Sequence, residues 1–209
     1  PPSRVFTPSD GILRISVNLH GIIYNEATDA IVLTDIGSAA DIEAMFKHID
    51  NRFHTLDALV NNAGIIHLGN VSGLSDADFE DMMNINVTGM MRCCKQAFDR
   101  MTKGGSIVNI SSIAGIQGTE KFPGFWGYTA SKFAVVGLTE GLAVEGAPLG
   151  ICVNCIAPGA TETEMLRKAA PGLKAGAQPE DIAKIAYYLC DQEQSGILSG
   201  TTIPVFSNA

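Results

Sequence analysis

The sequence predicts a doubly wound α/β fold, in which a parallel sheet lies between two layers of helices. Short apolar runs at 56–60, 106–110, 150–156 and 201–205 show little polar alternation, which is typical of strands buried in a parallel sheet. The patterns between them are helical and long enough for the crossover that joins two parallel strands. We therefore expect a three-layer α/β/α arrangement, with one domain over residues 1–209 and no internal repeat.

The first part of the chain, residues 1–34, is atypical for such a fold. Residues 1–10 are polar and rich in proline, as in a loose terminus. Apolar runs at 12–19, 22–24 and 31–33 predict short strands with little room for a helix between them. Ser38 then starts a helix that we expect to reach Phe53, with Asp41 as the acid of a capping box.

The rest of the chain alternates strands with helices. The expected elements, in order, are a strand at 56–60, a long helix from Ser75 to about Lys103, a strand at 106–110, a loop at 113–125, a helix at 127–146, a strand at 150–156, a loop at 158–163, a helix at 179–190 and a strand at 201–205. Such an alternation predicts right-handed crossovers throughout.

Composition excludes several classes of function. The net charge of −8 argues against nucleic acid or an anionic membrane as the main partner. Neither an apolar run long enough for a transmembrane helix nor a secretory signal is visible, so we expect a cytoplasmic protein. Five cysteines, an odd number, indicate reduced thiols, and the histidines lack the spacing of metal ligands.

One pair of residues carries the strongest chemical signal. Tyr128 and Lys132 stand four positions apart, so on a helix their side chains leave the same face. A neighbouring ammonium favours the phenolate, and we expect Lys132 to lower the pKa of Tyr128 from its ordinary value of about 10. The pair by itself is common, and a lysine on a helix is usually solvated.

Further motifs flank this pair in a fixed order. Asn61-Asn62-Ala63-Gly64, Asn86-Val87-Thr88-Gly89 and Asn109-Ile110-Ser111-Ser112-Ile113-Ala114-Gly115 precede it, and Pro158-Gly159-Ala160-Thr161-Glu162-Thr163 follows it. Together they resemble the short-chain dehydrogenase/reductase family, from about Asp35 to about Pro204. The resemblance implies a Rossmann-like fold and hydride transfer between NAD or NADP and a secondary alcohol or ketone.

The resemblance also implies a catalytic set. Tyr128 matches the general acid/base, and Lys132 matches the lysine that lowers its pKa and binds the nicotinamide ribose. Ser112 matches the serine that holds the substrate oxygen, in preference to Ser111, although either serine can simply cap a turn. Asn86 matches the asparagine that holds a water for proton relay, or else it bonds backbone groups and kinks its helix.

The cofactor-binding residues follow from the same resemblance. Asn62, Ala63 and Gly64 match the turn on the adenosine side of the cofactor, where small residues permit close backbone approach. Asp35 matches the acid that meets the adenine amino group, or it caps the next helix. The loop at the nicotinamide carboxamide is matched by Pro158, Gly159 and Thr161, with Thr163 as a phosphate ligand.

The glycine-rich phosphate turn of the family is missing. Residues 1–34 contain only Gly11 and Gly21, so no G-x-G-x-x-G pattern can be drawn. The chain is then a shortened member with a weak cofactor site, a fragment or altered form of a working enzyme, or a protein that keeps the fold without catalysis. Losing that turn should weaken binding of the cofactor phosphates.

Two hypotheses remain from these observations, and a third is remote. The first is an NAD(P)-dependent oxidoreductase with a small-molecule alcohol or ketone as substrate, and the second is a catalytically impaired binding or scaffold protein. A thiol-redox role for Cys152 and Cys155 is disfavoured, because a strand at 150–156 points them to opposite faces. The hypothesis of an apolar substrate wall rests on five residues: Phe122, Phe125, Trp126, Met165 and Leu166. The resemblance further implies a homo-oligomer, a dimer or tetramer, built on the two long helices, where Gly137 and Gly141 allow close approach.

Overall fold

The computed structural model contains a parallel sheet of five strands in the order β1-β2-β3-β4-β5. It describes residues 14–17, 34–53, 55–102 and 104–206. The strands are β1 (Arg14–Val17), β2 (Ala58–Asn61), β3 (Gly105–Ile110), β4 (Ile151–Pro158) and β5 (Thr202–Val205). Each strand pairs in parallel with the next one, which confirms the predicted sheet type.

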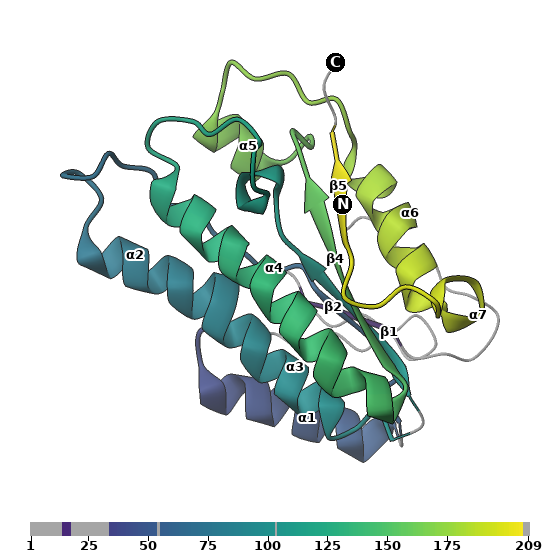
Figure 1. Cartoon of the computed structure of the whole chain (residues 1–209). Helices are drawn as coiled ribbons and strands as arrows, with labels where there is room; N and C mark the ends of the chain where they lie inside the picture. Colours follow the sequence, from purple (N-terminus) through teal and green to yellow (C-terminus); the bar gives the residue numbers. More distant parts are fainter. Residues whose placement is uncertain (1–13, 18–33, 54, 103, 207–209) are drawn as a thin grey trace.

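Helices cover both faces of this sheet, as expected for a three-layer fold (Figure 1). On one face lie α1 (Ala39–Arg52), the continuous helix made of α2 (Asp76–Met83), η1 (Asn84–Gly89) and α3 (Met90–Phe98), and α4 (Trp126–Gly146). Their buried side chains pack with Leu59, Ile107 and Val153 of the sheet. The opposite face carries α6 (Pro179–Cys190), which packs on Ala58, Val108 and Ile156.

The two faces alternate strictly along the central strands. Leu59 and Ile107 belong to one core, whereas their neighbours Ala58 and Val108 belong to the other. This alternation has a topological consequence, because the strand order runs in one direction across the sheet. The crossovers through α3 and α4 pass on one face and the crossover through α6 passes on the other, so the last one has the opposite hand. The expectation of a single hand for every crossover was wrong.

Most expected elements are present, with small differences at their ends. The helix expected from Ser75 to Lys103 ends earlier, at Phe98, and contains a π-helical stretch, η1, in its middle. Two short helices were not expected: α5 (Glu164–Ala169) and α7 (Gln192–Ser195). Of the strands expected before residue 34, only β1 is described, and the runs at 22–24 and 31–33 lie outside the described residues.

The caps explain where several helices begin. The Ser38 hydroxyl accepts from the backbone N–H of Asp41 at 3.3 Å, and that of Ser75 accepts from Asp78 at 3.1 Å. Only one half of the capping box predicted at Ser38 is present. In place of the Ser38 N–H, the Asp41 carboxylate accepts from the Asp35 N–H and from the Ser38 hydroxyl. A reciprocal box forms instead at α6, between Gln178 and Asp181.

Most of the cysteines are buried. All five cysteines are thiols, and Cys152 and Cys155 both lie on β4. Cys155 is buried in the core between sheet and helices, while Cys152 is half-buried near Gly196. No group of His, Cys, Asp or Glu in the described part of the chain could hold a metal ion. Within the same residues, the structure contains no helix of the length and apolarity that crossing a membrane requires.

Candidate active site

A cavity of about 1090 Å³ opens at the carboxyl edge of the sheet. Residues just after β2, β3 and β4 line it, among them Asn62, Ser112 and Gly159. In open α/β sheets this edge is where ligands bind, since the connections on either side of a strand diverge there. The first two turns of α4 bring Tyr128 and Lys132 to the same cavity.

Tyr128 and Ser112 meet inside this cavity. A hydrogen bond joins their side chains, although the two residues come from α4 and from the turn after β3. Burial raises the pKa of Tyr128 to about 12, and the bond to Ser112 acts in the opposite direction. The phenol is therefore a neutral proton donor at pH 7, held next to a second hydroxyl.

Lys132 lies one helical turn further along α4 and is also buried. Its ammonium donates to the Ile110 carbonyl at 3.0 Å and lies 5.6 Å from the centre of the Tyr128 ring. Burial lowers the pKa of Lys132 to about 8, and an interaction with Cys155 acts in the opposite direction. The shared helix face expected from the sequence is thus present.

The expected direction of the Tyr128 pKa was wrong. The charge of Lys132 by itself favours the phenolate, whereas the loss of solvent around the phenol disfavours it. In the structure burial is the largest cause and raises the pKa of Tyr128, whereas Lys132 is not among the causes. Desolvation outweighs a single cation at this distance from the ring.

Ser111 and Ser112 have different environments. The Ser111 hydroxyl donates to the Lys132 carbonyl at 2.8 Å, and the Ser111 side chain is buried. Ser112 caps a short 3₁₀ turn, η2 (Ile113–Gly115), by accepting from the Ala114 N–H at 3.1 Å. Ser111 therefore fixes the backbone of α4, while Ser112 is the serine hydrogen-bonded to Tyr128.

Asn86 sits in η1 and is almost fully buried. Its amide accepts from the Ile65 N–H at 2.8 Å and donates to the Ile65 carbonyl at 2.9 Å. It also donates to the hydroxyl of Ser131, at 3.0 Å. Asn86 therefore connects the long helix to the turn after β2 and to α4, a wider role than bonding to its own helix.

The residues matched to the cofactor site divide into two groups. Those that line the cavity are Asn62, Gly64, Lys132, Pro158, Gly159, Thr161 and Thr163. A Cβ built on Gly64 would lie 3.3 Å from both the Asn86 Oδ1 and the Lys132 Nζ, so this glycine leaves space beside the ammonium. Thr163 caps α5 by accepting from the Leu166 N–H at 3.1 Å, which occupies its hydroxyl oxygen in part.

Asp35 and Ala63 are not among the cavity-lining residues. The Asp35 carboxylate accepts from the Gly37 N–H at 2.8 Å and so closes the turn before α1. The Gly37 carbonyl accepts from Asn84 at 3.1 Å and from Arg92 at 3.3 Å, which fastens this turn to the long helix. The alternative from sequence, that Asp35 caps the next helix, was wrong, because Ser38 is the N-cap of α1 and Asp35 closes the turn before it.

A buried polar chain below the cavity was missed by the sequence analysis. The Asn61 amide donates to the Asn109 Oδ1 at 2.8 Å, and the Asn109 amide donates to the Thr139 hydroxyl at 3.0 Å. Two strands and α4 are joined in this way. An asparagine at the end of each of two apolar strands was the available signal, since a buried amide needs a partner.

Comparison with known proteins places this geometry in a family. The family model described as short chain dehydrogenase matches residues 17–174. The chain belongs to this family of oxidoreductases. A curated short-chain relative, (2S)-[(R)-hydroxy(phenyl)methyl]succinyl-CoA dehydrogenase subunit BbsD of Thauera aromatica, is 36% identical over 186 residues, which cover 83% of this chain and 73% of the relative.

Two further matches define how far the likeness extends. An uncharacterized oxidoreductase of Thermotoga maritima is 41% identical over 157 residues, covering 74% of this short-chain dehydrogenase and 59% of the relative. The solved structure of ElxO with NADP bound superposes with a TM-score of 0.73 at 34% identity, over 82% of this chain and 74% of ElxO. This similarity confirms the fold class, a Rossmann-like three-layer α/β arrangement.

The described residues fit the nicotinamide end of a dinucleotide. Gly64, which the resemblance placed on the adenosine side, lies next to the Lys132 ammonium and leaves room there for a hydroxyl-bearing group such as a ribose, and the loop at 158–163 lies on the same cavity. The resemblance would place the glycine-rich turn within residues 1–34, where no such pattern occurs. Most of these residues lie outside the described residues. The fit therefore rests on the nicotinamide side of the site.

Proposed function

We propose that this chain is an NAD(P)-dependent oxidoreductase that interconverts a secondary alcohol and a ketone, with Tyr128 as general acid/base. The observation that carries the proposal is the hydrogen bond between Tyr128 and Ser112 in a cavity that Lys132 also lines. The substrate named for the Thauera aromatica relative contains a hydroxy(phenyl)methyl group, which is itself a secondary alcohol. Hydride exchange at the substrate carbon is the chemistry that a bound NAD or NADP supplies.

The residues of the chain supply orientation and the proton. Ser112 donates to or accepts from the substrate oxygen, and Tyr128 transfers the proton to or from the same oxygen. Lys132, fixed by its bond to the Ile110 carbonyl, holds a ribose hydroxyl and keeps a positive charge near the phenol. Asn86 positions this end of the site through Ile65 and Ser131.

The protonation states favour one direction at neutral pH. A phenol with a pKa near 12 is protonated at pH 7, and it therefore gives a proton to a ketone oxygen more readily than it takes one from an alcohol. We accordingly propose ketone reduction as the direction to assay first, with NADH and NADPH compared side by side.

Replacing Tyr128 by phenylalanine tests the proposal. Removal of a general acid typically costs about 10²- to 10⁴-fold in rate, so Tyr128→Phe should lose ketone reduction by this factor. The matched control is Tyr188→Phe, because Tyr188 lies on α6 and is exposed, and its hydroxyl donates to the Gln194 carbonyl. An unchanged rate in Tyr128→Phe, with the control also unchanged, would refute the assignment.

The scaffold alternative from the sequence analysis makes a different prediction. It expects no saturable binding of NADH or NADPH, which can be followed by the fluorescence of the sole tryptophan, Trp126. Trp126 stacks on Phe79 with ring centres 5.5 Å apart and lies two positions before Tyr128. Saturable quenching by either nucleotide would exclude the scaffold reading.

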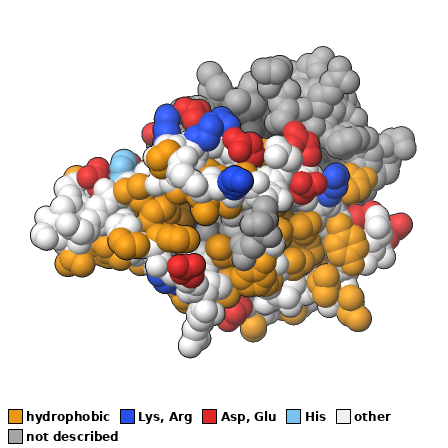
Figure 2. All heavy atoms as spheres, turned by 90° about the horizontal axis from the view of Figure 1, so that it is seen from above, with side chains coloured by type: hydrophobic (Ala, Val, Ile, Leu, Met, Phe, Trp, Pro, Cys, Tyr) orange, Lys and Arg blue, Asp and Glu red, His pale blue; other side chains and the backbone are white. Residues whose placement is uncertain are grey.

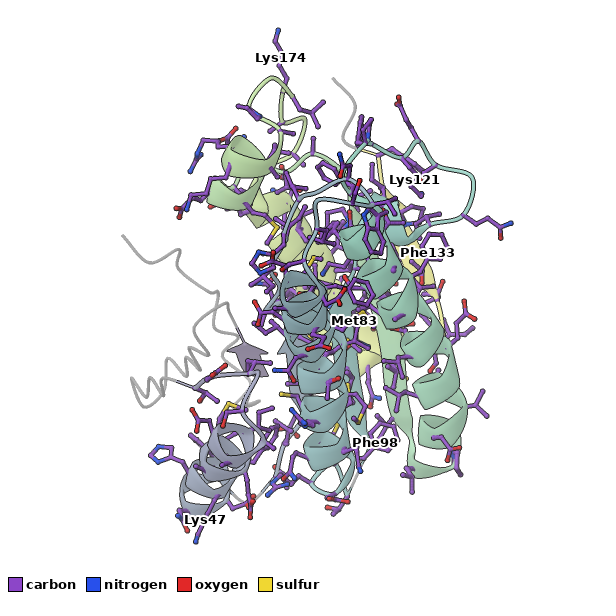
Figure 3. The ribbon with its side chains drawn as sticks, turned by 90° about the vertical axis from the view of Figure 1, so that its left-hand side faces the viewer. Lys47, Met83, Phe98, Lys121, Phe133 and Lys174 are labelled. Atoms are coloured by element: carbon purple, nitrogen blue, oxygen red, sulfur yellow. The ribbon has the colours of Figure 1, made fainter. Side chains whose placement is uncertain are left out.

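We also propose a homo-oligomer built on the long helix and α4. These helices lie side by side and form the surface turned to the viewer in Figure 3, where Met83, Phe98 and Phe133 are labelled. Phe133 and Val144 of α4 are exposed, at 39% and 74%, and apolar exposure of this kind is typical of an interaction surface. Gly137 and Gly141 carry no side chain, and the space next to them on the same helix is open.

A further inference from the structure

The cavity is larger than the reacting groups require. Pockets for small ligands have volumes of about 300–1,000 Å³, and this one, at about 1090 Å³, lies just above that range. Ser112, Tyr128 and Lys132 account for one part of its wall. Asn62, Gly64 and Gly159, which match the cofactor site, account for another part. The wall that is left should reflect the body of the substrate, because a cavity wall selects a ligand by shape and polarity.

Two apolar groups form much of this remaining wall. Ile113, Phe122 and Phe125 come from the loop between β3 and α4. Met165, Leu166 and Leu173 come from α5 and the residues after it. Figure 2, which looks onto the molecule from above, shows hydrophobic side chains gathered across this face. Of the five residues in the apolar wall suggested by the sequence, only Trp126 is not among the lining residues.

The aromatic side chains form a path toward the reacting groups. Phe122 is 42% exposed and packs edge-on against Phe125, with ring centres 5.8 Å apart. Phe125 in turn packs edge-on against Tyr128, at 6.3 Å. The loop that carries them is fastened by a bond from the Gly69 N–H to the Gly124 carbonyl. An apolar group bound along this path would lead from solvent to the Tyr128 hydroxyl.

The charged residues of the cavity favour a neutral ligand over an anion. Among the described lining residues the cations are three lysines, and each has a partner of its own. Lys121 donates to the Ile116 carbonyl at 2.7 Å and lies over the Phe133 ring, as Figure 3 shows, while Lys184 pairs with Asp181 at 3.0 Å. Lys132 is bonded to the Ile110 carbonyl. Three exposed carboxylates, Glu120, Glu164 and Glu180, also line the cavity and would repel a negative group.

We propose that the part of the substrate bound inside this cavity is an uncharged, extended apolar group attached to the reacting ketone or secondary alcohol. The group is aliphatic or aromatic and lies between the side chains of the 113–125 loop and those of α5. This inference rests on the proposed function. It adds that neither a carboxylate nor a phosphate close to the carbonyl is accepted.

A series of ketones tests the inference with the full chain and either nicotinamide cofactor. We expect kcat/KM to rise at least tenfold from butan-2-one to nonan-2-one, because each added methylene is removed from water. The matched pair hexan-2-one and 5-oxohexanoate differs only in a terminal methyl against a carboxylate. We expect the carboxylate to be poorer by tenfold or more, and equal values for the pair would overturn the inference.

A variant on the apolar wall gives a second measurement. Leu166→Ala removes part of that wall and should lower kcat/KM for nonan-2-one about tenfold, while the value for butan-2-one stays the same. The control is Leu149→Ala, since Leu149 is 51% exposed and does not line the cavity. Equal loss for both ketones in Leu166→Ala would contradict a role in apolar recognition.

Direct binding separates the two possible failures. Calorimetric titration of the protein with nonan-2-one should show saturable binding with a negative heat-capacity change, and Leu166→Ala should weaken it. Binding of nonan-2-one without turnover of any ketone would refute the proposed function and leave the apolar cavity supported. Turnover of butan-2-one and 5-oxohexanoate without preference for nonan-2-one would refute the inference and leave the function.

Discussion

The Asn86 side chain pairs with the backbone of Ile65 as a neighbouring strand would. It accepts from the N–H at 2.8 Å and donates to the carbonyl at 2.9 Å. The residues are 21 positions apart, and Asn86 lies in the π-helical stretch of the long helix. A π-helical turn carries an extra residue, and such turns are frequent at functional sites. Here the turn directs an amide toward the segment that follows Gly64.

Asn86→Ala should destabilise the protein. The substitution leaves the N–H and carbonyl of Ile65 without their partner, and each unsatisfied buried group costs about 1–3 kcal/mol. We expect the free energy of unfolding to fall by about 2 kcal/mol or more, measured by denaturant titration. Asn51→Ala is the control, because Asn51 is exposed on α1, and it should change stability by about 0.5 kcal/mol or less. Equal changes in both variants would show that the pairing with Ile65 contributes nothing.

Lys132→Met should raise stability at neutral pH while it removes turnover. The pKa of Lys132 is lowered from its ordinary 10.5 to about 8, so the folded protein holds a buried charge below pH 8 at a cost of up to about 3 kcal/mol. Between pH 8 and 10.5 the lysine is more fully protonated in the unfolded chain than in the folded one. The contribution of Lys132 to the free energy of unfolding of wild type therefore rises with pH across this range. The excess in free energy of unfolding of Lys132→Met over wild type should therefore shrink from pH 8 to pH 10.5.

The measurement is the difference in unfolding free energy between Lys132→Met and wild type at several pH values. Taking the difference removes the effect of titratable groups that do not interact with Lys132, such as Cys93, whose pKa burial raises to about 12. A difference that is constant from pH 7 to pH 10 would show that the ammonium is not desolvated in the folded state.

Gly137→Leu with Gly141→Leu should dissociate the homo-oligomer. Apart from the adjacent backbone of α4, a Cβ at either position meets no atom of the described residues within 4 Å, so the protomer itself should tolerate leucine and gain helix propensity. The same side chains would obstruct a partner packed closely on α4. We expect the mass from light scattering to fall, while Gly172→Leu, at an equally open position outside α4, keeps the wild-type mass. An assembly unaffected by the double variant would place the interface elsewhere.

Local signals in the sequence account for the parts of the fold that were predicted well. Ser38 and Ser75 cap their helices through contacts three residues away, and α6 has the bounds expected from its apolar spacing. The shared face of Tyr128 and Lys132 follows from the period of one helix. In each of these cases the interacting groups are only a few residues apart, so the local sequence is enough to predict the feature.

The features that only tertiary structure decided depend on groups distant in sequence. The bond between Ser112 and Tyr128, and the chain from Asn61 through Asn109 to Thr139, require strands and helices to be assembled first. The direction of the Tyr128 pKa depends on how completely the fold removes water from the phenol. The amino-acid order thus determined the elements and the reacting residues. The distances between elements and the loss of solvent, which set pairing and protonation, were fixed by packing.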